Sequence, residues 1–161
     1  MVTKETLTKY CDLIDLIDET EVRIRRIKAD IDRLDKRITA IENGEKVSDK
    51  VYGGEGGWQG FIIEGIPMPD YERFKTALLT KRLRLSEEAA VLAEHKDMLE
   101  SQRVDVQRFL MQVRDPHLKR IISFRCIDKL KWDEVARRMG GGNTEDSVKQ
   151  AFWRYVSKEI L

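Results

Sequence analysis

Apolar residues recur at alternating steps of three and four along the first long stretch of the chain, from about residue 3 to residue 43. The seam begins near Tyr10 and runs to Ile41, and charged side chains of both signs fill the positions between its members. This pattern predicts a long helix with one apolar stripe, which needs a partner helix to cover it. Asn43-Gly44 is expected to end the helix because both residues tolerate the left-handed backbone conformation.

A second seam occupies residues 70–114, where apolar residues return every seven positions from Tyr71 to Val113. Its alternate positions are partly polar and include Lys81 and Glu88. The two seams predict an antiparallel coiled-coil hairpin within one chain, with pairing between protomers in a bundle of four long helices as the alternative. The residues assigned to helix pairing and oligomerisation are Ile17, Ile24, Ile27, Ile31, Leu34, Leu85, Leu92 and Leu99.

Residues 44–69 separate the two seams and contain seven of the ten glycines in the chain. Val51-Tyr52 and Phe61-Ile62-Ile63 are β-prone, so a small β-ribbon or structured loop is expected at the tip of the hairpin. A phosphate-binding loop is disfavoured, because no Gly-Lys-Ser/Thr follows the glycines and no helix begins directly after them. An exposed docking patch around Trp58 and Phe61 is the remaining alternative for this segment.

A separate unit is predicted for residues 115–161, because Asp115-Pro116 disfavours continuation of the second long helix. Three short helices are expected in it, with one break near residues 128–131 and another at the glycines of residues 140–143. A small helix, a glycine turn and a longer helix are typical of a helix-turn-helix. The chain is therefore expected to be all-α, with a helical hairpin over residues 1–114 and a helix-turn-helix over the remainder.

The last of the three short helices is the candidate for reading DNA. An α-helix fits the major groove and meets base edges with its N-terminal residues. Gln150 could pair with adenine, and Lys149 could reach guanine or a phosphate. Basic residues on an exposed helix are more often only solvated surface, and three-helix units also dock proteins. The candidate DNA-binding residues are Thr144, Glu145, Ser147, Lys149, Gln150, Trp153, Arg154, Lys158, Arg137 and Arg138.

Charge adds modest support to this assignment. Residues 1–69 carry a net charge of −3 and residues 70–114 a net charge of +1. Residues 115–161 hold ten Lys and Arg against seven Asp and Glu, a net charge of +3. The positive excess therefore falls on the unit expected to meet DNA. Charged residues make up 37% of the whole chain, which suits long solvent-exposed helices better than a compact enzyme.

The sequence shows few residues that could form a disulfide, a metal site or a catalytic site. Cys11 and Cys126 lie far apart without a CxxC spacing and are expected to be buried reduced thiols. His95 and His117 are isolated, so neither a metal site nor a catalytic acid–base pair is predicted, and no cofactor is expected. Without such a site, the protein is not expected to be an enzyme. The chain also has no apolar run long enough to cross a bilayer, so a cytoplasmic protein is expected.

The unit over residues 115–161 resembles the C-terminal DNA-reading region of bacterial sigma factors. The resemblance rests on the run R-I-I-S-F-R-C-I-D-K-L-K-W-D-E-V-A-R-R-M-G and on the helix that follows it. Residues that match the sigma pattern are Trp132, Glu134, Val135, Ala136, Met139, Gly140, Thr144, Ser147, Val148, Lys149 and Gln150. The chain departs from the pattern in its extended Gly141-Gly142-Asn143 turn and in Ser147, where a basic residue is usual.

The layout of the whole chain also resembles small phage and prophage proteins of Gram-positive bacteria, which are similar to late-transcription activators of the ArpU and RinA kind. This resemblance implies a transcription regulator in the bacterial cytoplasm that binds double-stranded DNA as a homodimer or higher homo-oligomer. RNA polymerase is a further candidate partner. Two alternatives remain: an adaptor that docks RNA polymerase or a phage protein, and a small terminase-like subunit for DNA packaging.

Overall fold

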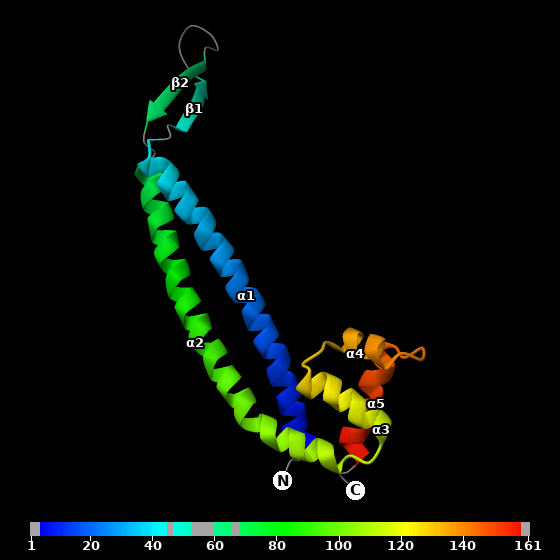
Figure 1. The fold of residues 1–161 in the computed structure, drawn as a ribbon. Coiled ribbons are helices and arrows are strands. Elements are labelled where there is room, and N and C mark those ends of the chain that lie inside the picture. Colours follow the sequence, from blue (N-terminus) through cyan, green and yellow to red (C-terminus); the bar gives the residue numbers. More distant parts are fainter. Residues whose placement is uncertain (1–3, 45–46, 53–59, 66–67, 159–161) are drawn as a thin grey trace. The chain divides into compact units, whose positions relative to one another are not determined.

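The computed structural model describes the backbone of residues 4–44, 47–52, 60–65 and 68–158, and side chains within residues 5–44 and 70–157 (Figure 1). The described part is mostly helical and is built on two long helices that pack together, as the sequence predicts. Its elements are α1 (Lys4–Glu42), β1 (Val47–Tyr52), β2 (Gly60–Gly65), α2 (Met68–Gln112), α3 (Pro116–Ile122), the π-helical turn η1 (Ser123–Ile127), α4 (Trp132–Met139) and α5 (Glu145–Lys158).

The segment Val22–Ala90 forms one compact unit, which contains parts of α1 and α2 and the two strands between them. The apolar seams of α1 and α2 face each other inside this unit. Ile24, Ile27 and Ile38 are buried on α1, and Leu78 is buried on α2. These helices therefore pair within one chain, and the apolar seams are covered without a second copy.

The polar positions of the α2 seam are used in ion pairs with α1. The ammonium group of Lys81 lies 2.8 Å from a carboxylate oxygen of Asp30, and Arg23 lies 3.2 Å from Glu88. The hydrogen bond from Lys81 holds the pKa of the Asp30 carboxyl below its ordinary value. Because each pair joins a specific position of α1 to a specific position of α2, a shifted alignment would separate opposite charges. The ion pairs thus favour one register of the two helices.

The strands β1 and β2, which lie between α1 and α2 in the sequence, form a two-stranded antiparallel sheet. Val47 lies opposite Gly65, and Val51 lies opposite Phe61. No side chain between residues 45 and 69 is described, and neither is the backbone of residues 53–59. The docking patch hypothesised around Trp58 and Phe61, and the rejected phosphate-binding loop, therefore lie outside the described residues.

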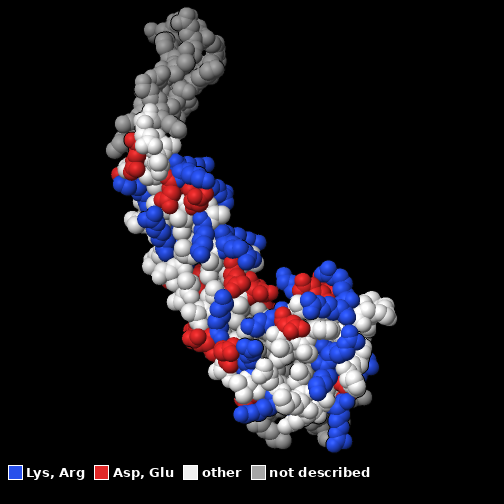
Figure 2. All heavy atoms as spheres, viewed as in Figure 1, with Lys and Arg blue, Asp and Glu red and all other residues white. Residues whose placement is uncertain are grey.

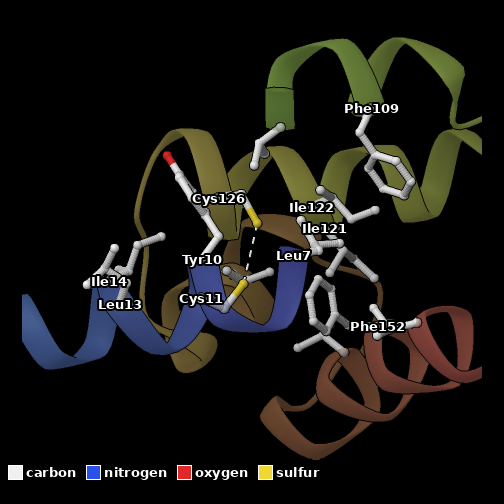
Figure 3. Packing of buried hydrophobic residues seen from close by; sticks show 14 of the residues in the cluster. Leu7, Tyr10, Cys11, Leu13, Ile14, Phe109, Ile121, Ile122, Cys126 and Phe152 are labelled. Atoms are coloured by element: carbon white, nitrogen blue, oxygen red, sulfur yellow. Dashed lines mark hydrogen bonds between the residues drawn. The ribbon is translucent and has the colours of Figure 1, made fainter. Parts of the chain in front are cut away.

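A second compact unit combines Met1–Glu21 with Val91–Leu161. This division differs from the predicted boundary at residue 114, because the first turns of α1 and the last turns of α2 share a core with α3, α4 and α5. In Figure 3, Leu7 and Tyr10 of α1 and Phe109 of α2 lie with Ile122 of α3 and Phe152 of α5. Tyr10, Ile122 and Phe152 have no exposed surface.

Cys11 of α1 and Cys126 of η1 meet inside this core. Their sulfur atoms lie 3.4 Å apart, and both residues are buried as free thiols (Figure 3). The hydrogen bond with Cys11 and burial raise the pKa of the Cys126 thiol. The prediction that both cysteines are buried is confirmed, but the sequence did not indicate that they touch.

Burial of Tyr10 predicts a pH dependence. Removal from water raises the pKa of the Tyr10 phenol to about 12, so the native state keeps this proton when an unfolded chain has released it. Stability is expected to fall as the pH rises from 10 to 12, by on the order of 2 kcal/mol from this residue. The measurement is urea unfolding at several alkaline pH values. Tyr10→Phe should show a shallower loss, and equal slopes for the two proteins would contradict the assignment.

Candidate nucleic-acid interface

The helices α3, α4 and α5 pack against one another within the second compact unit. α3 begins at Asp115, whose carboxylate accepts hydrogen bonds from the backbone amides of His117 (2.8 Å) and Leu118 (3.3 Å). Pro116 occupies the first helical position, where its missing amide donor costs nothing. Cap and proline together separate α3 from α2.

The π-helical turn η1 brings Arg125 into the core. A hydrogen bond from the amide of Asp128 to the carbonyl of Ser123 (3.0 Å) spans five residues and widens the turn. Two consecutive residues, Arg125 and Cys126, then both face inward, and only 1% of Arg125 is exposed. This is the one buried Arg, Lys, Asp or Glu among the described side chains.

Four interactions compensate the buried guanidinium of Arg125. It pairs with the carboxylate of Asp15 on α1 at 2.5 Å. It donates to the carbonyl oxygens of Leu130 (3.0 Å) and Cys11 (3.4 Å). It also lies 5.1 Å from the ring centre of Trp132, within the range of a cation–π interaction. Arg125 therefore ties α1 to the loop between η1 and α4.

α4 is a helix of two turns with one buried side. Val135, Ala136 and Met139 are buried, and the Glu134 carboxylate accepts a hydrogen bond from the amide of Lys131 (3.1 Å) at the start of the helix. Trp132, the first residue of α4, is half-buried against Phe152 at 5.2 Å between ring centres. α4 is thus held by its apolar side and leaves its charged side open.

The turn between α4 and α5 depends on three consecutive glycines. Gly140, Gly141 and Gly142 have φ values of 64°, 64° and 77°, a region that side-chain-bearing residues rarely adopt. Asn143 closes the turn, since both its backbone amide (3.2 Å) and its side-chain amide (2.6 Å) donate to the carbonyl of Gly140. The extended turn is therefore ordered by its own hydrogen bonds.

α5 begins with a reciprocal pair of hydrogen bonds between Thr144 and Ser147. The amide of Ser147 donates to the Thr144 hydroxyl (3.2 Å), and the amide of Thr144 donates to the Ser147 hydroxyl (2.9 Å). This is the pattern of a capping box, which satisfies amides at a helix start. Thr144 and Ser147 were both candidate DNA-binding residues, but their hydroxyls are occupied in starting the helix.

α5 buries Val148, Phe152 and Val156 and turns its other side to solvent. Lys149 is half-buried and pairs with Glu145 one turn earlier, at 2.5 Å. Gln150 and Arg154 are exposed one turn apart, so they lie on one side of the helix. The exposed residues of α5 are Glu145, Asp146, Ser147, Gln150, Trp153, Arg154 and Ser157. The side chain of Lys158, also a candidate, is outside the described residues.

The two arginines at the end of α4 differ in their partners. Arg137 pairs with Asp133 at 2.7 Å, and this hydrogen bond holds the pKa of the Asp133 carboxyl below its ordinary value. Arg138 has no carboxylate partner among the described residues. Its guanidinium lies 5.8 Å from the ring of Phe124, which Arg120 of α3 also approaches, at 5.7 Å. Arg138 and Arg120 therefore present unneutralised charge close together.

Figure 2 shows Lys and Arg side chains spread over the visible surface of α3, α4 and α5, with few Asp and Glu among them. Neither Arg120 nor Arg125 was predicted from the sequence to have a functional or structural role. Spacing offered a signal for Arg125, because Leu118, Ile121, Ile122 and Arg125 follow the i, i+3, i+4, i+7 pattern of a buried stripe.

The residues assigned to oligomerisation lie within the long helices of a single chain. Ile17, Ile24, Ile27 and Leu99 are buried, while Ile31, Leu34, Leu85 and Leu92 are half-buried. Their apolar surface is largely covered inside one protomer.

Among the described residues, no group of three or more His, Cys, Asp and Glu side chains is arranged to hold a metal ion. Of the helices whose residues are described, none is long and apolar enough to cross a membrane.

Comparison of the chain with protein-family models, with curated proteins and with solved structures found no match.

Proposed function

We propose that this protein binds double-stranded DNA and regulates transcription, with α4, the glycine turn and α5 acting as a helix-turn-helix. The observation that carries the proposal is the exposed side of α5, where Gln150 and Arg154 stand one turn apart without an acidic partner among the described residues. Glutamine can pair with the edge of adenine, and arginine with guanine or a phosphate. The resemblance of residues 115–161 to the DNA-reading region of sigma factors, and of the whole chain to regulators of phage genes in the bacterial cytoplasm, supports the proposal.

Ion pairing changes the ranking of the candidate residues. Lys149 and Arg137 are each neutralised by a carboxylate one turn away, so each would have to exchange that partner for DNA. Arg154, Arg138 and Arg120 have no carboxylate partner among the described residues, so they could bind DNA without giving one up. Phosphate contacts are accordingly assigned to these three arginines, and base contact is assigned to Gln150.

The test is binding of the full-length chain to duplexes selected from a random-sequence library, followed by fluorescence anisotropy at several salt concentrations. Arg154→Ala should weaken binding to all duplexes and lower the salt slope by about 1. Gln150→Ala should relax the preference at a single base pair by about 1–3 kcal/mol. Arg25→Ala, an exposed arginine on α1, is the matched control and should change neither.

Two results would count against the proposal in different ways. If the wild-type chain binds no duplex at low salt, DNA binding itself is wrong. If it binds but Gln150→Ala and Arg154→Ala behave like Arg25→Ala, then α5 is not the reading helix.

A second candidate, an adaptor that docks another protein, is supported by the acidic start of α5. Glu145 and Asp146 occupy its first turn, where they would approach the phosphates of a duplex. Trp153, which lies further along α5 and is 38% exposed, would supply an apolar anchor for a protein partner. Failure of duplex binding together with capture of RNA polymerase that Trp153→Ala abolishes would favour the adaptor.

A further inference from the structure

Two free thiols touch in the core of the second compact unit. The sulfur atoms of Cys11 on α1 and Cys126 on η1 lie 3.4 Å apart (Figure 3). The sulfur atoms of a disulfide are about 2.05 Å apart, so these two would have to approach by only about 1.4 Å. They are the two cysteines of the chain, and 115 positions separate them in the sequence. The fold thus brings both thiols of the chain to one point.

The backbone segments that carry the thiols are held together by contacts that do not involve sulfur. Arg125, the residue before Cys126, donates a hydrogen bond to the carbonyl oxygen of Cys11 at 3.4 Å. Its guanidinium also pairs with the carboxylate of Asp15, one turn further along α1. Tyr10 and Ile122, which have no exposed surface, belong to the same core. A disulfide would therefore join two segments that already lie side by side.

The closed core keeps both thiols reduced. Only 2% of Cys11 and none of Cys126 is exposed. The hydrogen bond with Cys11 and burial raise the pKa of the Cys126 thiol, and a thiol that keeps its proton reacts slowly with oxidants. An oxidant therefore reaches the sulfur atoms only when part of the core opens.

The first turns of α1 are the part whose opening would expose the thiols. Cys11 lies about two turns from Lys4, the first residue of α1. Local opening at the end of an element costs less free energy than unfolding of the whole protein. Detachment of these turns would bring Cys11 into water and would remove the hydrogen bond and part of the cover of Cys126. Both thiols would then react as ordinary exposed thiols.

We propose that Cys11 and Cys126 form a redox site, in which a peroxide joins them in a disulfide after the first turns of α1 open. The thiolate of one cysteine attacks a peroxide oxygen, so that an S–O bond forms, the O–O bond breaks and hydroxide leaves. When α1 packs back, the second thiolate attacks this sulfenic acid. The S–S bond forms, the S–O bond breaks and the oxygen leaves as water. Two thiols and one hydrogen peroxide thus give one disulfide and two water molecules.

The disulfide would tie the start of α1 to η1 by a covalent bond. Leu7 and Tyr10, which complete the core beneath α3 and α5, could then no longer detach from it. Oxidation would therefore stabilise the unit that holds the candidate nucleic-acid interface. The proposal does not depend on DNA binding.

Peptide mapping of the full-length chain tests formation of the disulfide. The reduced, folded protein is treated with hydrogen peroxide, and remaining thiols are then blocked with iodoacetamide. Trypsin leaves the cysteines on separate peptides, residues 10–23 and 126–129, and a cross-link between these two is expected. Its rate of formation should not change when the protein is diluted. Disulfides between chains, or thiols that are blocked by iodoacetamide after prolonged treatment, would overturn the proposal.

Urea unfolding tests the effect of the disulfide on stability. The oxidised protein should unfold at a urea midpoint higher by on the order of 1 M, because the cross-link restrains the unfolded chain. Dithiothreitol should return the midpoint to its original value. Cys11→Ala and Cys126→Ala, each compared before and after peroxide, are the matched controls and should show no rise. They keep all five methionines, so they also correct for methionine oxidation. An oxidised wild-type chain whose midpoint does not rise would show that the disulfide does not fit the native core.

The rate of oxidation tests the opening of α1. Asp15→Asn removes the carboxylate that holds Arg125, so the first turns of α1 should detach more easily and the disulfide should form at least about tenfold faster. Lys9→Ala breaks an exposed pair with Glu5 on the same helix and should leave the rate unchanged. Equal rates for the two variants would contradict entry of the oxidant through α1.

Discussion

Asp15→Asn is expected to lower the free energy of unfolding by about 3 kcal/mol, although Asp15 lies half-exposed on α1 and far in sequence from its partner. The reason is the partner, Arg125, which is 1% exposed and keeps its positive charge after the substitution. A buried guanidinium without a carboxylate is more costly than a half-exposed carboxylate without a guanidinium, since water can still reach the latter. The measurement is urea unfolding followed by circular dichroism and by tryptophan fluorescence.

Companion variants separate the buried charge from the loss of hydrogen bonds. Arg125→Met removes the charge but leaves the carbonyl oxygens of Leu130 and Cys11 without their donor, at about 1–3 kcal/mol. The double variant Asp15→Asn with Arg125→Met should be more stable than the sum of the two single losses predicts. Strict additivity would show that Asp15 does not compensate Arg125. Lys9→Ala, which breaks an exposed pair with Glu5 on the same helix, should change stability by less than about 1 kcal/mol.

Phe152→Ala should be the most damaging single substitution in α5, with a loss of about 3–5 kcal/mol. The Phe152 ring has no exposed surface and meets the rings of Trp132 and Trp153 edge-on at 5.2 Å and 5.1 Å. Its removal leaves a cavity at the point where α5 packs on Trp132, the first residue of α4. Thermal and urea unfolding measure the loss.

Trp153→Ala is the matched control for Phe152→Ala, because it removes a larger neighbouring ring that is partly in solvent. The expected loss is about 1 kcal/mol or less. If the two substitutions cost the same, α5 does not pack as described. The comparison also serves the functional test, since Phe152→Ala should abolish DNA binding together with the fold, whereas Arg154→Ala should weaken binding in a folded protein.

Heptad spacing was enough to predict the two long helices, because apolar steps of three and four are imposed by helix geometry. The polar members of the α2 seam were visible as well, but their partners were not. Lys81 meets Asp30 and Glu88 meets Arg23 only once the relative position of the helices is known. That position depends on packing over the whole length of the seams, which no local pattern encodes.

The side-chain interactions of the candidate nucleic-acid interface were harder to predict from the sequence than the two long helices. The pair Glu145–Lys149 has a spacing of four and could have been anticipated from helix geometry. The capping box of Thr144 and Ser147 also has a local signature. The position of Arg125 fits the buried stripe of Leu118, Ile121 and Ile122, but a sequence pattern gives no reason to place an arginine in a core, where its charge must be compensated. The compensating carboxylate of Asp15 lies on α1, far away in the sequence, so the burial of Arg125 could not be anticipated.

The compact unit that holds α3, α4 and α5 also includes Met1–Glu21, and this has a consequence for the order of folding during synthesis. Cys11 and Cys126, which touch in its core, are separated by 115 residues. The ribosome completes the pairing segments of Val22–Ala90 first, so the hairpin can form while Leu7, Tyr10 and Ile14 still lack their cover. This apolar stretch is fully covered only after α5 has been synthesised, and until then it is accessible to chaperones and to aggregation.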